Sequence, residues 1–204
     1  MTWLQTVDKL FPLTVLAAVV LFVAKEIIEA IRRRGDKARK ARAIKGLLIE
    51  EIELNHWTIG SLRDTLETIE QQHKDDPSTE FALKVDASGG THFRSYRPDQ
   101  KGGAGSGRAI PLVHRKQFDT FLPALAELDK SLFEQVRNGY SRIGDLEHIR
   151  SSLIAYLAEE DPAEKRHLIA FPSYGLRVLR EVDEAIRPLY KSFAGKELQK
   201  ARIR

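Results

Sequence analysis

Near the N-terminus, an uncharged apolar run extends from Leu10 to Ala24. As a helix these residues span about 22 Å, somewhat less than the ~30 Å hydrocarbon core of a bilayer. Apolar residues on both flanks, such as Trp3 and Ile31, lengthen the run, and Pro12 falls near its first turn, where a missing N–H costs least. The pattern predicts a transmembrane helix within residues 1–34.

A cleaved signal peptide and a buried core helix are the alternative interpretations of this run. A signal peptide would carry Asp8 in its N-terminal part, and it would place the bulky Phe22 where a small residue should precede Ala24. Eight lysines and arginines follow between Arg32 and Lys45, and such a cluster is typical of the cytoplasmic side of a membrane protein. We therefore expect a single-pass protein with its N-terminus outside.

Small residues gather on one face of the predicted membrane helix. At helical spacing this face carries Thr14, Ala17, Ala18, Leu21 and Ala24. Small side chains let helices approach closely in lipid. We expect the helices of several copies to associate through this face, with the lipid bilayer and further copies of the chain as partners.

A second apolar pattern lies within residues 37–72. Its steps alternate between four and three, and Asn55 occupies the same phase as the apolar members Leu48, Ile52, Ile59, Leu62, Leu66 and Ile69. This spacing is the seam of a helical bundle or coiled coil, in which a buried Asn fixes the register. The seam packs inside its own domain or pairs between subunits, and in the second case Asn55 belongs to the oligomer interface. The acidic residues Glu50, Glu51 and Glu53 are interpreted as a solvated face.

Between residues 73 and 115 the pattern changes from helical to alternating. Apolar residues alternate with polar ones at Phe81, Leu83 and Val85, and a Ser-Gly-Gly turn leads to a second segment, 91–97. This pattern predicts a short β-hairpin. The stretch 101–108 holds four glycines and predicts a flexible loop.

The C-terminal half returns to helical spacing. An apolar face between Phe118 and Leu128 contains Pro123, which starts or interrupts a helix, and Asp129 is expected to cap one long helix that continues to Leu157.

The segment 161–164 reads as a helix start. A last helix is expected over 173–193, bent or ended by Pro188. The predicted fold class is mainly α: a transmembrane anchor with its basic flank in 1–34, a cytoplasmic helical bundle in 35–195 with a small β-hairpin insert at about 80–110, and a basic tail in 196–204.

Composition narrows the chemistry. The 33 lysines and arginines exceed the 29 acids by a net charge of +4, so bulk charge does not indicate a nucleic-acid-binding protein. The absence of cysteine excludes disulfides, thiolate metal sites and cysteine nucleophiles. No two histidines have the spacing of a metal site on a helix. We expect neither a metal nor a cofactor.

Positive charge gathers around the predicted hairpin and glycine loop. Arginines beside aromatic side chains, next to free backbone N–H groups, suit a phosphate-bearing ligand such as a nucleotide or single-stranded nucleic acid. The predicted ligand-binding residues are Arg94, Tyr96, Arg97, Lys101, Arg108 and Arg115. The alternative is a solvated loop that touches acidic lipid or nothing.

Arg142 and His148 have the spacing of the HEPN ribonuclease motif, in which an Arg and a His act on an RNA phosphodiester. The same spacing recurs at Arg108 and His114, and Ile143 stands where the family commonly has Asn, Asp or His. The alternative is a surface Arg and His on an amphipathic helix. The two residues are the catalytic candidates of this sequence.

The layout of anchor, basic stretch and helical body resembles small bacterial antiphage membrane effectors. The pore protein that accompanies some RNA-targeting CRISPR nucleases, with its HEPN-like body, and the channel of the Hailong system are of this kind. The resemblance implies an oligomeric channel or pore of the bacterial inner membrane, gated by a nucleotide, an oligonucleotide or a partner protein. The alternatives are a membrane-tethered HEPN-type ribonuclease and a non-catalytic scaffold that recruits a soluble partner.

Overall fold

The structure of the chain is a computed structural model that describes residues 13–97, 106–161 and 165–199. The chain forms two compact units, Met1–Ile44 and Lys45–Arg204. One helix, α2 (Leu13–Asp75), contributes residues to both.

The described part of the first unit is helical from Leu13 onward. Large apolar side chains on this part of α2 are exposed, and their exposed fractions range from 43% at Val15 to 70% at Leu21. No helix in the described part of the chain is both long and apolar enough to cross a membrane. Residues 10–12, which begin the apolar run in the sequence, lie outside the described residues.

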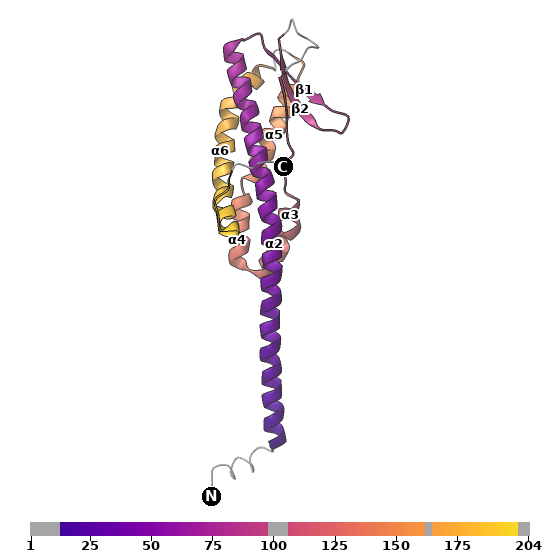
Figure 1. The fold of residues 1–204 in the computed structure, drawn as a ribbon, viewed down its shortest axis with the longest axis vertical. Helices are drawn as coiled ribbons and strands as arrows, with labels where there is room; N and C mark the ends of the chain where they lie inside the picture. Colours follow the sequence, from indigo (N-terminus) through magenta and orange to yellow (C-terminus); the bar gives the residue numbers. More distant parts are fainter. Residues whose placement is uncertain (1–12, 98–105, 162–164, 200–204) are drawn as a thin grey trace. The chain divides into compact units, whose positions relative to one another are not determined.

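The second unit is a helical bundle with a small sheet. Its further helices are α3 (Lys116–Leu128), α4 (Lys130–Tyr140), α5 (Ile143–Ala158) and α6 (Arg166–Ala194). In Figure 1 these helices lie beside the C-terminal half of α2, and the sheet lies near the C-terminal end of that helix. The prediction of a mainly helical bundle is confirmed.

The apolar seam of α2 is packed inside this domain. Its six apolar members, Leu48, Ile52, Ile59, Leu62, Leu66 and Ile69, are at most 1% exposed. Of the two arrangements that the spacing allowed, the structure has the one within a single chain. Burial of these side chains is the main free-energy gain that holds α2 to the bundle.

Glu51 corrects the interpretation of the acidic cluster as a solvated face. Its side chain is 3% exposed and lies at the start of α3, where it accepts hydrogen bonds from the backbone N–H groups of Gln117 (2.6 Å) and Phe118 (3.1 Å). The first N–H groups of a helix have no partner within the helix, so a carboxylate there satisfies them and interacts well with the helix dipole. Tyr140 Oη donates a third bond at 2.9 Å.

Three antiparallel strands form the sheet in the order β1 (Glu80–Val85), β2 (Thr91–Tyr96), β3 (Ser106–Ala109). The predicted hairpin is confirmed, with Leu83 opposite Phe93 and the rings of Phe81 and Phe93 stacked 5.9 Å apart. The prediction of a flexible loop is wrong for residues 106–108, which pair with β2, and residues 101–105 lie outside the described part. A Cβ at Gly107 would lie 3.3 Å from the carbonyl oxygen of Phe93, so glycine here permits close pairing.

Asp86 organises the turn between β1 and β2. Its Oδ1 accepts from the backbone N–H groups of Ser88 (2.9 Å) and Gly90 (2.8 Å), and its Oδ2 lies 3.0 Å from His92 Nε2. Hydrogen bonds from the Ser88 hydroxyl, His92 and Gly90 hold the pKa of Asp86 well below its usual value. Gly89 has a φ of 83°, a left-handed conformation that glycine adopts without strain.

The predicted long helix that starts at Asp129 is two helices, α4 and α5. Asp129 caps α4 as expected, since its Oδ1 accepts from Leu132 N–H at 3.1 Å. The break lies at Ser141, whose hydroxyl (2.7 Å) and N–H (3.3 Å) both donate to the Asn138 carbonyl. The apolar stripe keeps its helical period across the break and is buried on both sides, so periodicity alone did not reveal it.

The prolines interrupt less than the sequence suggested. Pro123 lies inside α3, and α6 begins at Arg166 rather than near 173, with Pro172 and Pro188 both inside it. A proline inside a helix costs about 3 kcal/mol or more, and here the buried stripe of α6 from Leu168 to Tyr190 offsets that cost. Residues 162–164 of the start signal lie outside the described residues.

Candidate functional site

The structure divides the predicted ligand-binding residues among several places. Arg94 and Tyr96 alternate in β2 with the buried Phe93 and Ser95, so they lie on the face of the sheet away from the core. Arg108 is paired with Phe93 in the register of the sheet and lies on the opposite face.

The other predicted ligand residues lie farther along the chain. Arg97 Nε is 3.4 Å from Asp76 Oδ2. Arg115 pairs with Asp119 at 3.2 Å, and its guanidinium lies 5.6 Å from the centre of the Phe118 ring. Lys101 lies outside the described residues. The six residues therefore do not share one face of the sheet.

A cleft of about 660 Å³ lies between α2, β3 and α6 of the second unit. Its lining combines an indole, a bare stretch of helix backbone, several guanidinium groups and two carboxylates; the residues are His56, Trp57, Gly60, Ser61, Arg63, Asp64, Glu67, Arg108, Ala109 and Arg187. Among the predicted ligand residues that the structure describes, Arg108 lines this cleft.

A buried ion-pair network adjoins the cleft. Asp183, on α6, is 7% exposed and accepts hydrogen bonds from His56 Nδ1 (2.9 Å) and Arg187 Nε (2.9 Å). Arg187 Nη2 forms an ion pair with the same carboxylate at 2.8 Å. Burial by itself would raise the pKa of Asp183, but the hydrogen bonds from His56 and Arg187 outweigh it and the pKa is lowered. Asp183 is thus an ionised carboxylate, and it holds in place two side chains that line the cleft, His56 and Arg187.

Arg63 and Arg108 are less firmly held than Arg187. Arg63 Nη2 lies 3.9 Å from Asp183 Oδ2. Arg108 pairs with Asp64, but both side chains are about half exposed, at 45% and 56%. Ion pairs this exposed contribute at most about 1 kcal/mol. Two guanidinium groups can therefore turn to an anionic ligand in the cleft at little cost.

Tertiary structure, rather than local pattern, brings these residues together. His56 and Asp183 are 127 positions apart, and each reads in the sequence as an ordinary polar residue on a helix. The local signals were the step of four between Asp183 and Arg187, and the position of Trp57 outside the apolar seam. Neither signal identifies a site without the fold.

The catalytic candidates lie elsewhere. Arg142 precedes α5, is about half exposed, and contacts Asp145 (3.0 Å) and Glu181 (3.7 Å) through Nη1. The hydrogen bond to Asp145, followed by the charges of both acids, raises the pKa of Arg142. His148 is exposed on α5. In the described part of the chain, no group of three His, Cys, Asp or Glu could hold a metal ion.

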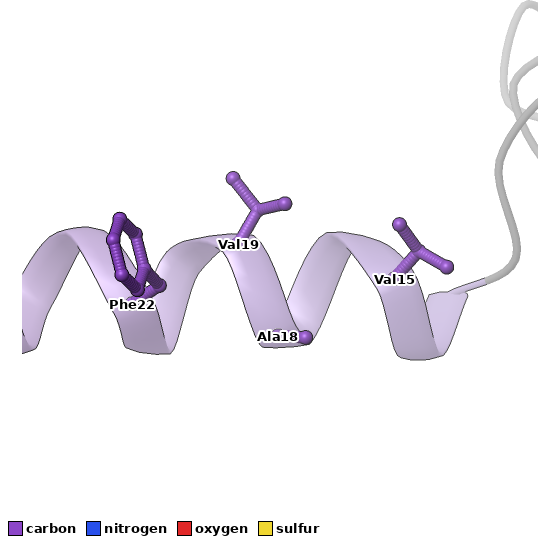
Figure 2. Close-up of a pocket in the computed structure, with 4 residues that line it drawn as sticks. All are labelled: Val15, Ala18, Val19 and Phe22. Carbon is purple, nitrogen blue, oxygen red and sulfur yellow. The ribbon is translucent and has the colours of Figure 1, made fainter.

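A shallow hollow of about 390 Å³ lies on the surface of α2 in the first unit, lined by Val15, Ala18, Val19 and Phe22. Figure 2 shows the three larger side chains along the helix and the small Ala18 between them. The residues that line the hollow lie one position after those of the predicted small-residue face, and Ala18 belongs to both sets.

The remaining residues predicted to mediate assembly are divided between the two units. Ala17, Leu21 and Ala24 are exposed on α2, and the side chain of Thr14 lies outside the description. Asn55 is fully buried in the second unit and hydrogen-bonded to the backbone of His114.

Comparison of the chain with protein-family models, curated proteins and solved structures found no match.

Proposed function

We propose that the chain is a single-pass membrane effector that assembles through its N-terminal helix and is controlled by a ligand or partner protein at its helical domain. One observation carries this proposal: between Val15 and Ile31, ten large apolar side chains are exposed on α2, and eight basic residues follow directly. Large apolar side chains exposed in this number need an apolar environment, which a bilayer supplies.

The charge pattern supports one orientation. The uncharged run begins in the sequence at Leu10, three residues before the described part of α2, and ends at Ala24. The cluster from Arg32 to Lys45 would then lie at the inner surface, where anionic lipids attract it. The N-terminus is outside and the bundle is cytoplasmic in this arrangement.

Assembly is supported by the hollow at Ala18. Its lining residues stand at positions i, i+3, i+4 and i+7, the set that receives one side chain of a neighbouring helix in knobs-into-holes packing. A single helix cannot enclose a pore, so conduction requires several copies. The layout is similar to channel-forming antiphage effectors, in which a ligand opens the pore only if it binds one arrangement better than the other.

Membrane insertion is tested by carbonate extraction of the full-length protein from bacterial membranes. The wild type should stay in the pellet, and Leu21→Arg should shift the protein to the soluble fraction, because an arginine in mid-bilayer is costly. Leu54→Arg is the matched control, since Leu54 is also an exposed leucine on α2, at 45%. Complete extraction of the wild type would contradict the membrane anchor.

Assembly and conduction are tested on the same protein in detergent and in planar bilayers. We expect a complex of several chains, and Ala18→Leu, which fills the hollow, should lower the assembled fraction. Ala30→Leu, on the same helix outside the hollow, should leave it unchanged. A strictly monomeric wild type would contradict assembly but not the membrane anchor. An oligomer that passes no current either alone or with ribonucleoside triphosphates added would contradict channel activity gated by such a ligand.

A further inference from the structure

Gly60 lies inside α2 and lines the cleft. A glycine in a helix interior costs about 1 kcal/mol relative to alanine, and close packing explains two of the helical glycines in this bundle. A Cβ at Gly139 would lie 2.5 Å from Leu189 Cδ2, and one at Gly175 would lie 2.6 Å from Leu66 Cδ1. At Gly60 a Cβ would meet nothing within 4 Å. The bare backbone here leaves open space in the cleft.

The open space has an aromatic neighbour. Trp57 lies one turn before Gly60, on the same face of α2, and it also lines the cleft. An indole beside bare helix backbone offers a flat, apolar surface on which a planar ring can stack. Base–aromatic stacking of this kind accepts any base, because every base has a π-face.

Positive charge borders the same space. Arg63 and Arg108 line the cleft, and both are weakly held. Arg63 Nη2 lies 3.9 Å from Asp183 Oδ2, beyond hydrogen-bond distance, and both side chains of the Arg108–Asp64 pair are about half exposed. Guanidinium groups bind phosphate oxygens in bidentate fashion. A phosphate can take the place of Asp64 at Arg108, while Arg187 stays fixed on Asp183 through a hydrogen bond from Nε and an ion pair through Nη2.

We propose that this cleft binds a nucleotide, with the base on Trp57 and the backbone of Gly60, and the phosphates on Arg63 and Arg108. The volume of about 660 Å³ falls in the range of small-molecule sites. The inference rests on the proposed function in that it names the controlling ligand, but the binding itself does not depend on membrane insertion.

The ligand class is tested by calorimetry on the purified full-length protein. The probes are the four ribonucleoside monophosphates and the four triphosphates. Adenosine tests the base without a phosphate, and tripolyphosphate tests the phosphates without a base. At least one nucleotide should bind with a Kd below about 1 mM, and each of the two partial probes should bind at least about tenfold more weakly. If no nucleotide binds, or if tripolyphosphate binds as tightly as the best nucleotide, the proposal is wrong.

The location is tested by filling the cleft. Gly60→Leu places a side chain in the open space, removes the cost of a helical glycine and should abolish nucleotide binding without lowering the melting temperature. Gly46→Leu is the matched control: Gly46 also lies in α2 with nothing within 4 Å of a Cβ, but outside the cleft lining. Undiminished binding by the Gly60→Leu protein would overturn the assignment.

Two side-chain variants separate stacking from charge. Trp57→Ala should weaken every nucleotide at least about fivefold and leave tripolyphosphate unaffected, whereas Arg63→Ala should weaken triphosphates more than adenosine. Arg137→Ala, an exposed arginine on α4, is the control.

The membrane anchor and the nucleotide cleft can fail independently. Nucleotide binding by a wild-type protein that carbonate extracts from the membrane would contradict the anchor alone. A carbonate-resistant oligomer that binds no nucleotide would contradict the cleft alone.

Discussion

Asn55 and His114 exchange two hydrogen bonds: Asn55 Nδ2 donates to the His114 carbonyl at 2.7 Å, and His114 N–H donates to Asn55 Oδ1 at 2.8 Å. Two further side chains of α2 continue this contact at steps of three. Thr58 Oγ1 donates to the Leu112 carbonyl at 2.9 Å and Ser61 Oγ donates to the Ala109 carbonyl at 3.0 Å. Together they hold the end of β3 and the segment after it along α2, and so position Arg108 at the cleft.

Replacing Asn55 by alanine should lower the free energy of unfolding by roughly 2–4 kcal/mol, because two hydrogen bonds are lost and the N–H and carbonyl of His114 lose the side chain that satisfied them. Urea denaturation followed by circular dichroism measures the change. Asn138→Ala, at an exposed position of α4, should change stability by less than about 0.5 kcal/mol. Equal losses in the two variants would contradict this role of Asn55.

Glu51→Gln should be similarly costly, by roughly 2–4 kcal/mol, since the amide presents an NH₂ group where the buried carboxylate accepts three hydrogen bonds. Glu50→Gln is the matched control at the neighbouring, exposed position. In hydrogen-exchange measurements, the backbone amides of Gln117 and Phe118 should lose protection first, because Glu51 accepts their hydrogen bonds. Unchanged protection of these amides in Glu51→Gln would argue against the cap.

Two tyrosines should make stability depend on pH in the alkaline range. Burial, followed by the hydrogen bond to Glu53, raises the pKa of Tyr190 from 10.0 to about 12. Burial and the charge of Glu51 raise the pKa of Tyr140 further still. Because the pKa of Tyr190 is higher in the folded state than in the unfolded state, its contribution to stability is complete at pH values below the unfolded-state pKa. This contribution is lost as the pH rises from about 10 to about 12.

The alkaline prediction is checked by tyrosinate absorbance of the wild type minus that of Tyr190→Phe. The difference should show one step with its midpoint near pH 12. The free energy of unfolding of the wild type should fall above pH 10, and less steeply in Tyr190→Phe. A step near pH 10 in this difference curve would show that the fold does not raise the pKa of Tyr190.

Gly139→Ala should destabilise the bundle by about 1–3 kcal/mol, because the new Cβ would lie 2.5 Å from Leu189 Cδ2 and force α4 away from α6. Gly144→Ala in α5, where nothing lies within 4 Å of a Cβ, should instead stabilise the protein by up to about 1 kcal/mol. Thermal unfolding of the two variants measures both effects. Opposite signs are expected, and the same sign in both would contradict the close approach of these helices.

Much of the fold followed from local patterns. The seam of α2 was predicted residue by residue, because the burial of one helix face leaves a period in the sequence. The hairpin and the cap at Asp129 followed from alternation and from turn and capping residues. The break at Ser141, the pairing of β3 and the passage of α6 through two prolines did not, because each depends on contacts with distant segments.

The candidate site divides in the same way. The sequence by itself determined the apolar run, its basic flank and the buried phase of Asn55, since these depend on residue type at fixed spacing along one helix. Only the tertiary structure decided that Glu51 is buried, that Arg94 and Arg108 lie on opposite faces of the sheet, and that Trp57 and Arg63 line a cleft with Arg187. The reason is physical: a side chain's partners and exposure are set by whichever segment packs against it, and here α6 and β3 come from far along the chain.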